Sequence, residues 1–217
     1  MGFTAVLFDW RGTLVATQST REWVTDGLLR ADRTADIDAI IARIDEADGP
    51  EHRLDTPGMD ADRDLHEHIF FEVMADAGID PALAAALYAS ESDPARNPWA
   101  ADAAPTITAL KARGVLIGVV SDIHFDIRQA FATVGLRNEI DAFALSYEVG
   151  AQKPSAEIYQ YALESLGVPA SEALMVGDRA HPDGGAVEHG MTVLLVPPLQ
   201  SPEDQRLGRM FNLPDSA

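Results

Sequence analysis

Five short, nearly continuous apolar segments constrain the fold of this chain more than any other feature of its sequence. Such segments are typical of parallel strands that are covered on both faces, because neither face then needs polar side chains. From residue 105 onwards they alternate with amphipathic helical patterns. We therefore predict an α/β fold with a doubly wound parallel sheet. The expected strands are 4–9, 115–121, 142–145, 173–176 and 192–196.

Residues 16–97 follow a different pattern, with turn signals and helical periodicity but no convincing strand. The apolar stripe from Leu65 to Ala77 recurs at helical spacing and is expected to be the core of this insertion. We predict a helical cap over 16–97, inserted after the first strand of a core made of 1–15 and 98–217. Within the core, helices are expected from about Pro105 to Arg113 and from Ser155 to Leu166.

Charge and composition narrow the classes of partner. The 217 residues include 35 acidic and 16 basic side chains, for a formal net charge of −19. This balance argues against nucleic acid and anionic membrane as partners, because both bind basic patches. The chain has no cysteine, which fits a cytoplasmic protein, and no apolar segment long enough to span a bilayer. We expect a monomer or homodimer that binds a small anionic substrate.

Polar side chains follow several of the predicted strands. The carboxyl ends of parallel strands meet at one edge of a sheet, so these side chains are expected to converge. Carboxylates with a hydroxyl and an amine suit a hard divalent cation such as Mg²⁺ together with an anionic ligand. The converging residues are Asp9, Ser121, Asp122, Lys153, Asp178 and Asp183.

The same residues lie in four ordered motifs. Together the motifs resemble those of the haloacid dehalogenase (HAD) superfamily, and the helical insertion resembles the C1-type cap of that superfamily. The motifs are Phe8-Asp9-Trp10-Arg11-Gly12-Thr13-Leu14, Val119-Val120-Ser121-Asp122, Gln152-Lys153-Pro154, and Val176-Gly177-Asp178 followed by Asp183-Gly184-Gly185-Ala186.

The resemblance implies that Asp9 attacks phosphorus, or an sp³ carbon in the dehalogenase branch, to give an aspartyl intermediate that water hydrolyses. It also implies a Mg²⁺ cofactor in the phosphatase branch. Gly185-Ala186 follows Asp183 one residue sooner than is common in the family, which leaves Asp183 as either a ligand or a supporting group. The implied catalytic residues are Asp9, Arg11, Thr13, Ser121 and Lys153; the candidate substrate contacts are Trp10, Gly12 and Asp122; and the candidate metal ligands are Asp9, the backbone carbonyl of Arg11, Asp178 and Asp183.

Arg11 departs from the family pattern, which carries an acidic general acid at this position. A guanidinium cannot donate the proton, because its pKa lies above roughly 12. Turnover then requires a leaving group that needs no proton, or another donor such as His124 or His181. Alternatively, Arg11 clamps a substrate anion or pairs with Asp9 and quenches it. A second pair of histidines, His66 and His68, lies two apart on a helix; we expect both to be solvated, with no metal between them.

We therefore predict a HAD-like hydrolase that acts on a small phosphorylated metabolite through Asp9. A 2-haloacid dehalogenase is the first alternative, because that branch also lacks the second acid and needs no metal. An anion-binding homologue without turnover is the second alternative, which Arg11 permits.

Overall fold

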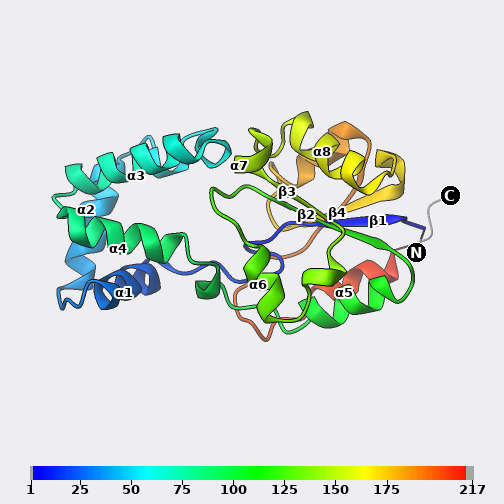
Figure 1. Ribbon diagram of the computed structural model, residues 1–217, viewed down its shortest axis with the longest axis horizontal. Helices are drawn as coiled ribbons and strands as arrows, with labels where there is room; N and C mark the ends of the chain where they lie inside the picture. The colour runs from blue at the N-terminus through cyan, green and yellow to red at the C-terminus, as the bar shows by residue number, and fades with distance from the viewer. Residues whose placement is uncertain (1, 214–217) are drawn as a thin grey trace.

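The computed structural model describes residues 2–213, and its centre is a five-stranded sheet in which every neighbouring pair is parallel (Figure 1). The predicted α/β class with a doubly wound parallel sheet is confirmed. All five predicted strands are present, with ends that differ by no more than one residue. Across the sheet they run β3 (Ala142–Leu145), β2 (Leu116–Ser121), β1 (Ala5–Phe8), β4 (Ala173–Gly177) and β5 (Thr192–Leu195).

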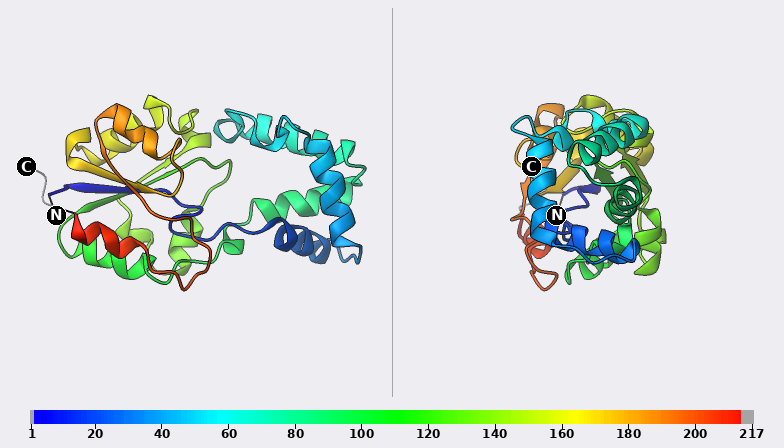
Figure 2. Two further views of the ribbon diagram at one scale, coloured as in Figure 1. Left: turned by 180° about the vertical axis from the view of Figure 1, so that it is seen from behind. Right: turned by 90° about the vertical axis from the view of Figure 1, so that its left-hand side faces the viewer.

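Helices cover both faces of the sheet, as its apolar strands require. Val6 and Phe8 of β1 belong to the hydrophobic cluster formed with α5 (Ala103–Lys111) and α6 (Arg128–Thr133). Leu7 faces the other way, into the cluster that contains α8 (Ala156–Leu166). This alternation places α5 and α6 on one side and α8, with the short α7 (Ser146–Val149), on the other (Figures 1 and 2).

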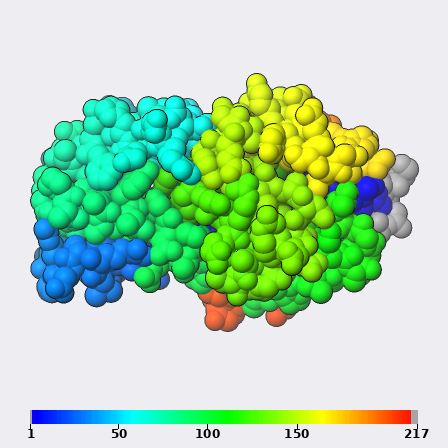
Figure 3. Space-filling model, viewed as in Figure 1, coloured from blue at the N-terminus to red at the C-terminus, as the bar shows by residue number. Residues whose placement is uncertain are grey.

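Five α-helices lie between β1 and β2, and the first four form what we call the helical subdomain, residues 20–91. They enclose their own hydrophobic cluster, to which Val24, Phe70 and Leu87 contribute. Figure 1 shows these helices beyond the carboxyl ends of the strands. Figure 3 shows their surface in contact with that of the sheet domain, by which we mean the five strands with α5, α6, α7 and α8. The helices are α1 (Thr20–Arg30), α2 (Ile37–Asp48), α3 (Arg63–Asp76) and α4 (Pro81–Glu91), with short 3₁₀ helices η1 (Arg53–Asp55) and η2 (Met59–Ala61) before α3.

Local sequence signals explain where these helices begin and end. Ser19 and Glu22 form a capping box at the start of α1, which satisfies two otherwise unpaired backbone N–H groups. The Asp62 side chain accepts hydrogen bonds at the start of α3, and the Asp80 side chain does so at the start of α4. Gly167, at a φ of 68°, ends α8 in the left-handed region that glycine adopts most readily.

Two connecting segments join the helical subdomain to the rest, and they run side by side. The N–H of Ala16 donates to the carbonyl of Pro98 at 2.8 Å, and the N–H of Ala100 donates to the carbonyl of Leu14 at 2.9 Å. The outgoing chain and the returning chain therefore meet shortly after the carboxyl end of β1. Among residues 2–213, no helix has the length and apolarity to cross a membrane.

Candidate active site

The ends of the strands meet the helical subdomain around a cavity of about 610 Å³. Its walls come from both parts of the molecule, so a ligand that fills it contacts both. The cavity includes Arg179, which the sequence reasoning missed although it directly follows Asp178 at the end of β4. Other residues of its wall are Asp9, Ser121, Asp122 and Asp178 from the strand ends, and Asp55 and Asp60 from the helical subdomain.

Asp9 and Lys153 form the centre of this site. The Lys153 ammonium donates to Oδ1 of Asp9 at 2.5 Å and to Oδ1 of Asp183 at 2.6 Å. All three side chains are buried, at 3% exposure or less. A cation shared by two buried carboxylates is held in one position, because leaving any of the three unpaired is costly.

Burial and the neighbouring charges shift the pKa of Asp9 in opposite directions, and the same is true of Lys153. Burial raises the pKa of Asp9 to about 7, although the nearby Lys153 ammonium lowers it. Burial by itself lowers the pKa of Lys153, but the carboxylates around it, Asp9 foremost, outweigh that effect and raise it above its usual range. Lys153 therefore stays cationic at neutral pH, and Asp9 reaches its nucleophilic carboxylate form as the pH rises through about 7.

Asp183 uses its second oxygen to shape the loop after β4. Its Oδ2 accepts hydrogen bonds from the backbone N–H groups of Asp178 (3.0 Å) and Arg179 (2.8 Å). A Cβ on Gly177 would lie 2.2 Å from Cγ of Asp183, so this close approach requires glycine. Both oxygens of Asp183 thus accept hydrogen bonds from protein donors.

Asp178 and Asp9 lie on either side of the Thr13 hydroxyl. The distance from Oγ1 of Thr13 to Oδ1 of Asp178 is 3.0 Å, and to Oδ2 of Asp9 it is 3.3 Å. Gly12, at a φ of 82°, packs so closely on the Asp178 carboxylate that a Cβ would lie 2.5 Å from it. Carboxylate oxygens of Asp9, Asp178 and Asp183 lie within 4.8 Å of one another, as the ligands of a hard divalent cation do.

The second strand-end motif contributes a hydroxyl and a structural carboxylate. Ser121 ends β2, is buried, and contributes to the cavity wall beside Asp9. The Asp122 carboxylate accepts from the backbone N–H of Lys153 at 2.8 Å and from Nη2 of Arg179 at 3.1 Å. Asp122 therefore holds the loop that delivers Lys153, and it also orients the arginine that faces the cavity.

The Arg11 side chain binds residues of α4 and of the returning segment. Its three guanidinium nitrogens donate to Oε1 of Glu91 at 2.9 Å, to the backbone carbonyl of Glu91 at 2.8 Å and to Oδ1 of Asn97 at 3.1 Å. The structure thus pairs Arg11 with Glu91 rather than with the nucleophile. Trp10 also differs from the expectation that it contacts the substrate. Its ring is fully buried in the hydrophobic core, edge-on to Phe125. It is not part of the wall of the Asp9 cavity.

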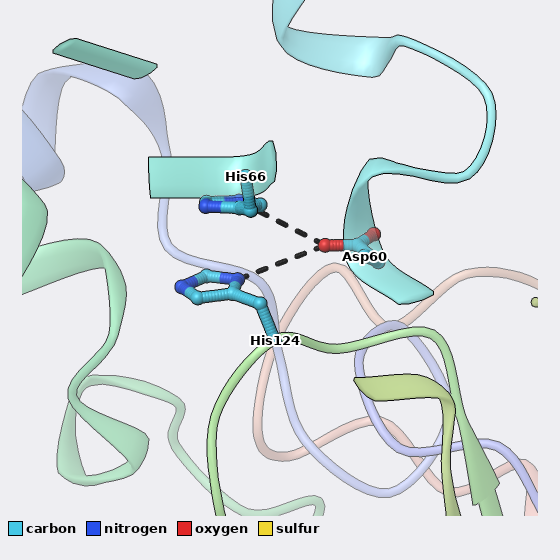
Figure 4. A group of neighbouring side chains, drawn as sticks. All are labelled: Asp60, His66 and His124. Carbon is cyan, nitrogen blue, oxygen red and sulfur yellow. Dashed lines mark ion pairs between the residues drawn. The ribbon is translucent and has the colours of Figure 1, made fainter. Parts of the chain in front are cut away.

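His66 is buried at 6% exposure, so the expectation that it is solvated was wrong. Its ring stacks on that of His124, with centroids 3.4 Å apart and planes at 16° (Figure 4). Both rings face Asp60, with nitrogens 3.7 and 3.8 Å from its Oδ1. The lone pair of an imidazole nitrogen lies in the plane of its ring. In two stacked, nearly parallel rings the lone pairs therefore run parallel and do not converge on one metal ion. The cluster is therefore built as a stacked contact between the two parts of the molecule.

The pKa values of the two stacked rings are shifted in opposite directions. Burial, together with the neighbouring His124, lowers the pKa of His66 to about 4. Burial also lowers the pKa of His124, but hydrogen bonds with Asp60 and Glu91 outweigh this effect and raise it. His124 is only 2% exposed, and its Nε2 lies 2.9 Å from the Ser92 hydroxyl and 3.0 Å from Oε2 of Glu91. His181 is exposed, and neither His124 nor His181 contributes to the wall of the Asp9 cavity.

A second cavity of about 360 Å³ adjoins the first and shares Arg11, Thr17 and Asp55 with it. Its other walls belong mainly to the helical subdomain and combine polar side chains, Glu91 and His66 among them, with aromatic and apolar ones. They include Trp23, Leu54, Met59 and Phe70.

Comparison with known proteins agrees with this geometry. The model of the haloacid dehalogenase-like hydrolase family matches residues 3–189. The chain belongs to this family. In this HAD-like hydrolase the match covers every strand-end residue described above, from Asp9 to Asp183. The resemblance predicted from the four motifs is thus confirmed, and so is its assignment as a hydrolase.

Named relatives of this HAD-like hydrolase include phosphatases. The phosphoserine phosphatase of Thermus thermophilus is 30% identical over 159 residues, which are 70% of this chain and 64% of that protein. The glyceraldehyde 3-phosphate phosphatase of Methanothermobacter thermautotrophicus is 32% identical over 93 residues, 42% of this chain and 41% of that protein. The chain thus matches less than two thirds of the length of either relative.

The similarity in fold to a solved structure covers more of the chain than these sequence matches do. The 2-haloacid dehalogenase of Pseudomonas syringae superposes with a TM-score of 0.63 at 19% identity, over 97% of each chain. At this identity the likeness concerns the fold.

Proposed function

We propose that this HAD-like hydrolase is a Mg²⁺-dependent phosphatase that acts on a small phosphorylated metabolite through an aspartyl phosphate at Asp9. The observation that carries the proposal is the pairing of Asp9 with Lys153 on one oxygen and, through Thr13, with Asp178 on the other. This arrangement leaves an ionisable carboxylate, a fixed cation and a metal-binding carboxylate beside one cavity. The phosphatases among the relatives support it.

The donor set fits a magnesium ion. Asp9 and Asp178 would hold it, with the backbone carbonyl of Arg11, while Asp183 keeps Lys153 and the loop after β4 in place. The bound ion would supply positive charge that offsets the charge of a phosphate and of the two carboxylates. Arg179 adds a protein cation to the cavity wall, and we assign it to the substrate phosphate.

The chain's own residues then account for the reaction. An oxygen of Asp9 attacks phosphorus and forms the new P–O bond as the bond to the leaving oxygen breaks. Lys153 holds Asp9 in place and neutralises the charge that develops, while Ser121 hydrogen-bonds the transferring group. Water hydrolyses the aspartyl phosphate, which releases inorganic phosphate and restores the Asp9 carboxylate.

The leaving group receives no proton from Arg11, because a guanidinium is too weak an acid, and each of the three nitrogens of Arg11 donates to Glu91 or Asn97. A general acid contributes about 10²- to 10⁴-fold to such reactions. We therefore infer a preference for substrates whose leaving group is already a weak base, such as an acyl phosphate. The remainder of the substrate would occupy the second cavity, which has both polar and apolar walls.

The test is phosphate release from acetyl phosphate and from an alkyl phosphate of similar size, with Mg²⁺ and with EDTA. We expect turnover that needs Mg²⁺, with acetyl phosphate faster by about 10²-fold or more because it needs no general acid. Equal rates would contradict the inference about the leaving group.

The same samples separate the alternative functions. Chloride release from 2-chloropropionate without metal would identify a dehalogenase. Phosphate binding with no turnover of any of these substrates would identify an anion-binding homologue. Either result would refute the proposed phosphatase.

A further inference from the structure

The carboxylate of Glu91 contacts two loops of the sheet domain at once. Its Oε1 accepts a hydrogen bond from Arg11 at 2.9 Å, and its Oε2 lies 3.0 Å from Nε2 of His124. Arg11 belongs to the loop after β1, two residues beyond Asp9, and His124 to the loop after β2, three residues beyond Ser121. A single side chain at the end of α4 thus joins the loops that carry the nucleophile and the Ser121 hydroxyl.

Arg11 also fixes the segment through which the chain returns from the helical subdomain. Besides the Glu91 carboxylate it binds the Glu91 carbonyl and the Asn97 side chain, so its three nitrogens span residues 91–97. Its guanidinium lies 5.2 Å from the centroid of the Phe125 ring, on the loop of His124. The planar group of arginine makes several directed hydrogen bonds together, which the single ammonium of a lysine cannot reproduce.

The three side chains of this contact are partly or fully buried. The side chains of Glu91 and Arg11 are 24% and 27% exposed, and that of His124 is 2% exposed. Burial raises the pKa of Glu91, but His124 and Arg11 outweigh it and lower the value to about 2, so the carboxylate stays ionised. Removing one member leaves a poorly solvated charge on the others, which favours separation of the two parts of the molecule.

Other contacts hold the opposite edge of the interface. The Ser146 hydroxyl donates to the carbonyl of Asp60 at 2.7 Å, and the Arg63 guanidinium lies 4.4 Å from the centroid of the Tyr147 ring. These contacts join η2 and α3 to α7, away from the connecting segments. The loop of His124 is also held by Arg63, whose Nε donates to the His124 carbonyl at 3.0 Å, and by the ring of His66. Glu91 differs from these contacts because its carboxylate binds the loop of Asp9 and the loop of Ser121 together.

We propose that Glu91 is a positioning residue whose bridge to Arg11 and His124 holds the loops of Asp9 and Ser121 in register while the helical subdomain is closed. Its catalytic consequence rests on the proposed phosphatase function, whereas the bridge itself does not. Arg11 then serves closure of the site and not proton transfer. Opening the subdomain releases the two loops from each other, so the site is complete only around an enclosed substrate.

Closure can be measured without any substrate. The chain has no cysteine, so Glu67→Cys on α3 and Gln160→Cys on α8, both exposed positions, accept two spin labels without competing sites. Pulsed electron spin resonance on the full chain then gives the distribution of distances between the labels. Glu91→Gln, Arg11→Met and the double variant are compared in this background. Arg53→Met is the matched control, because Arg53 pairs with Asp76 within the helical subdomain.

The unsubstituted background is expected to show mainly one short distance. Glu91→Gln and Arg11→Met should each raise the ratio of open to closed molecules by about tenfold, and Arg53→Met should leave it unchanged. The double variant should open no further than the stronger single variant, because both remove the same bridge. Unchanged distances in both single variants, additive opening in the double variant, or a background that is already open would overturn the proposal.

An activity measurement separates this proposal from the proposed function. With acetyl phosphate, Glu91→Gln should lower kcat about tenfold, and Arg53→Met should not change it. Shifted distances in a chain without phosphatase activity would leave the bridge standing and refute the phosphatase. Unshifted distances in an active phosphatase would refute the bridge alone.

Discussion

Replacing Asp9 with asparagine is expected to abolish phosphate release, with a fall in kcat of about 10⁴-fold or more. The amide has nearly the shape of the carboxylate but is no nucleophile toward phosphorus. The fold should survive, because Lys153 retains Asp183 as its partner at 2.6 Å. Initial rates with acetyl phosphate and thermal unfolding of the same preparation give both readouts.

Asp126→Asn is the matched control for this variant, since the Asp126 side chain is 54% exposed and outside the cavity. Its rate should equal that of the unsubstituted protein. An Asp9→Asn variant that keeps more than a tenth of the activity while remaining folded would remove Asp9 from the proposed chemistry.

Lys153→Met should damage stability and activity together. The variant leaves Asp9 and Asp183 buried with no cation between them, and removing one partner of a buried ion pair costs about 3–5 kcal/mol. Because the pKa of Lys153 is raised, its contribution is fully present below the pKa of the unfolded chain and therefore at pH 7. Urea unfolding at pH 7 measures the loss.

The pH dependence of the Lys153→Met variant gives a second readout. Lys153 lowers the pKa of Asp9, so without it that pKa rises from about 7 and activity should appear only at higher pH. Lys111, the chain's other lysine, pairs with Asp141 near the surface, and Lys111→Met should cost about 1 kcal/mol or less. Equal unfolding free energies for the two variants would contradict the role given to Lys153.

The sequence was sufficient to predict the sheet and the residues at its carboxyl edge. Apolar strands that are buried on both faces leave little choice of architecture, and parallel strands bring their ends to one edge. Lys153 and Asp183 could therefore be expected near Asp9, although they are 144 and 174 positions away along the chain. The short helices α6 and α7 escaped detection because each has too few residues for a periodic pattern.

The hydrogen-bond and packing partners of individual side chains could not be predicted from the sequence in the same way. Arg11 binds Glu91, 80 residues away in another part of the fold, and periodicity does not say which carboxylate will face a given arginine. His66 is buried because the loop of His124 covers it, which its helical position does not reveal. The partners of Asp183 could not be predicted either: its oxygens accept from the Lys153 ammonium and from the backbone N–H groups of Asp178 and Arg179.

Trapping the covalent intermediate tests the central claim most directly. The protein is mixed with acetyl phosphate and Mg²⁺, quenched in acid within one turnover, reduced with borohydride and mapped by mass spectrometry. An acyl phosphate on Asp9 would be reduced to homoserine at position 9, and we predict this product there and its absence in Asp9→Asn. Full turnover without any modified residue, or with the modification on another carboxylate, would contradict the account.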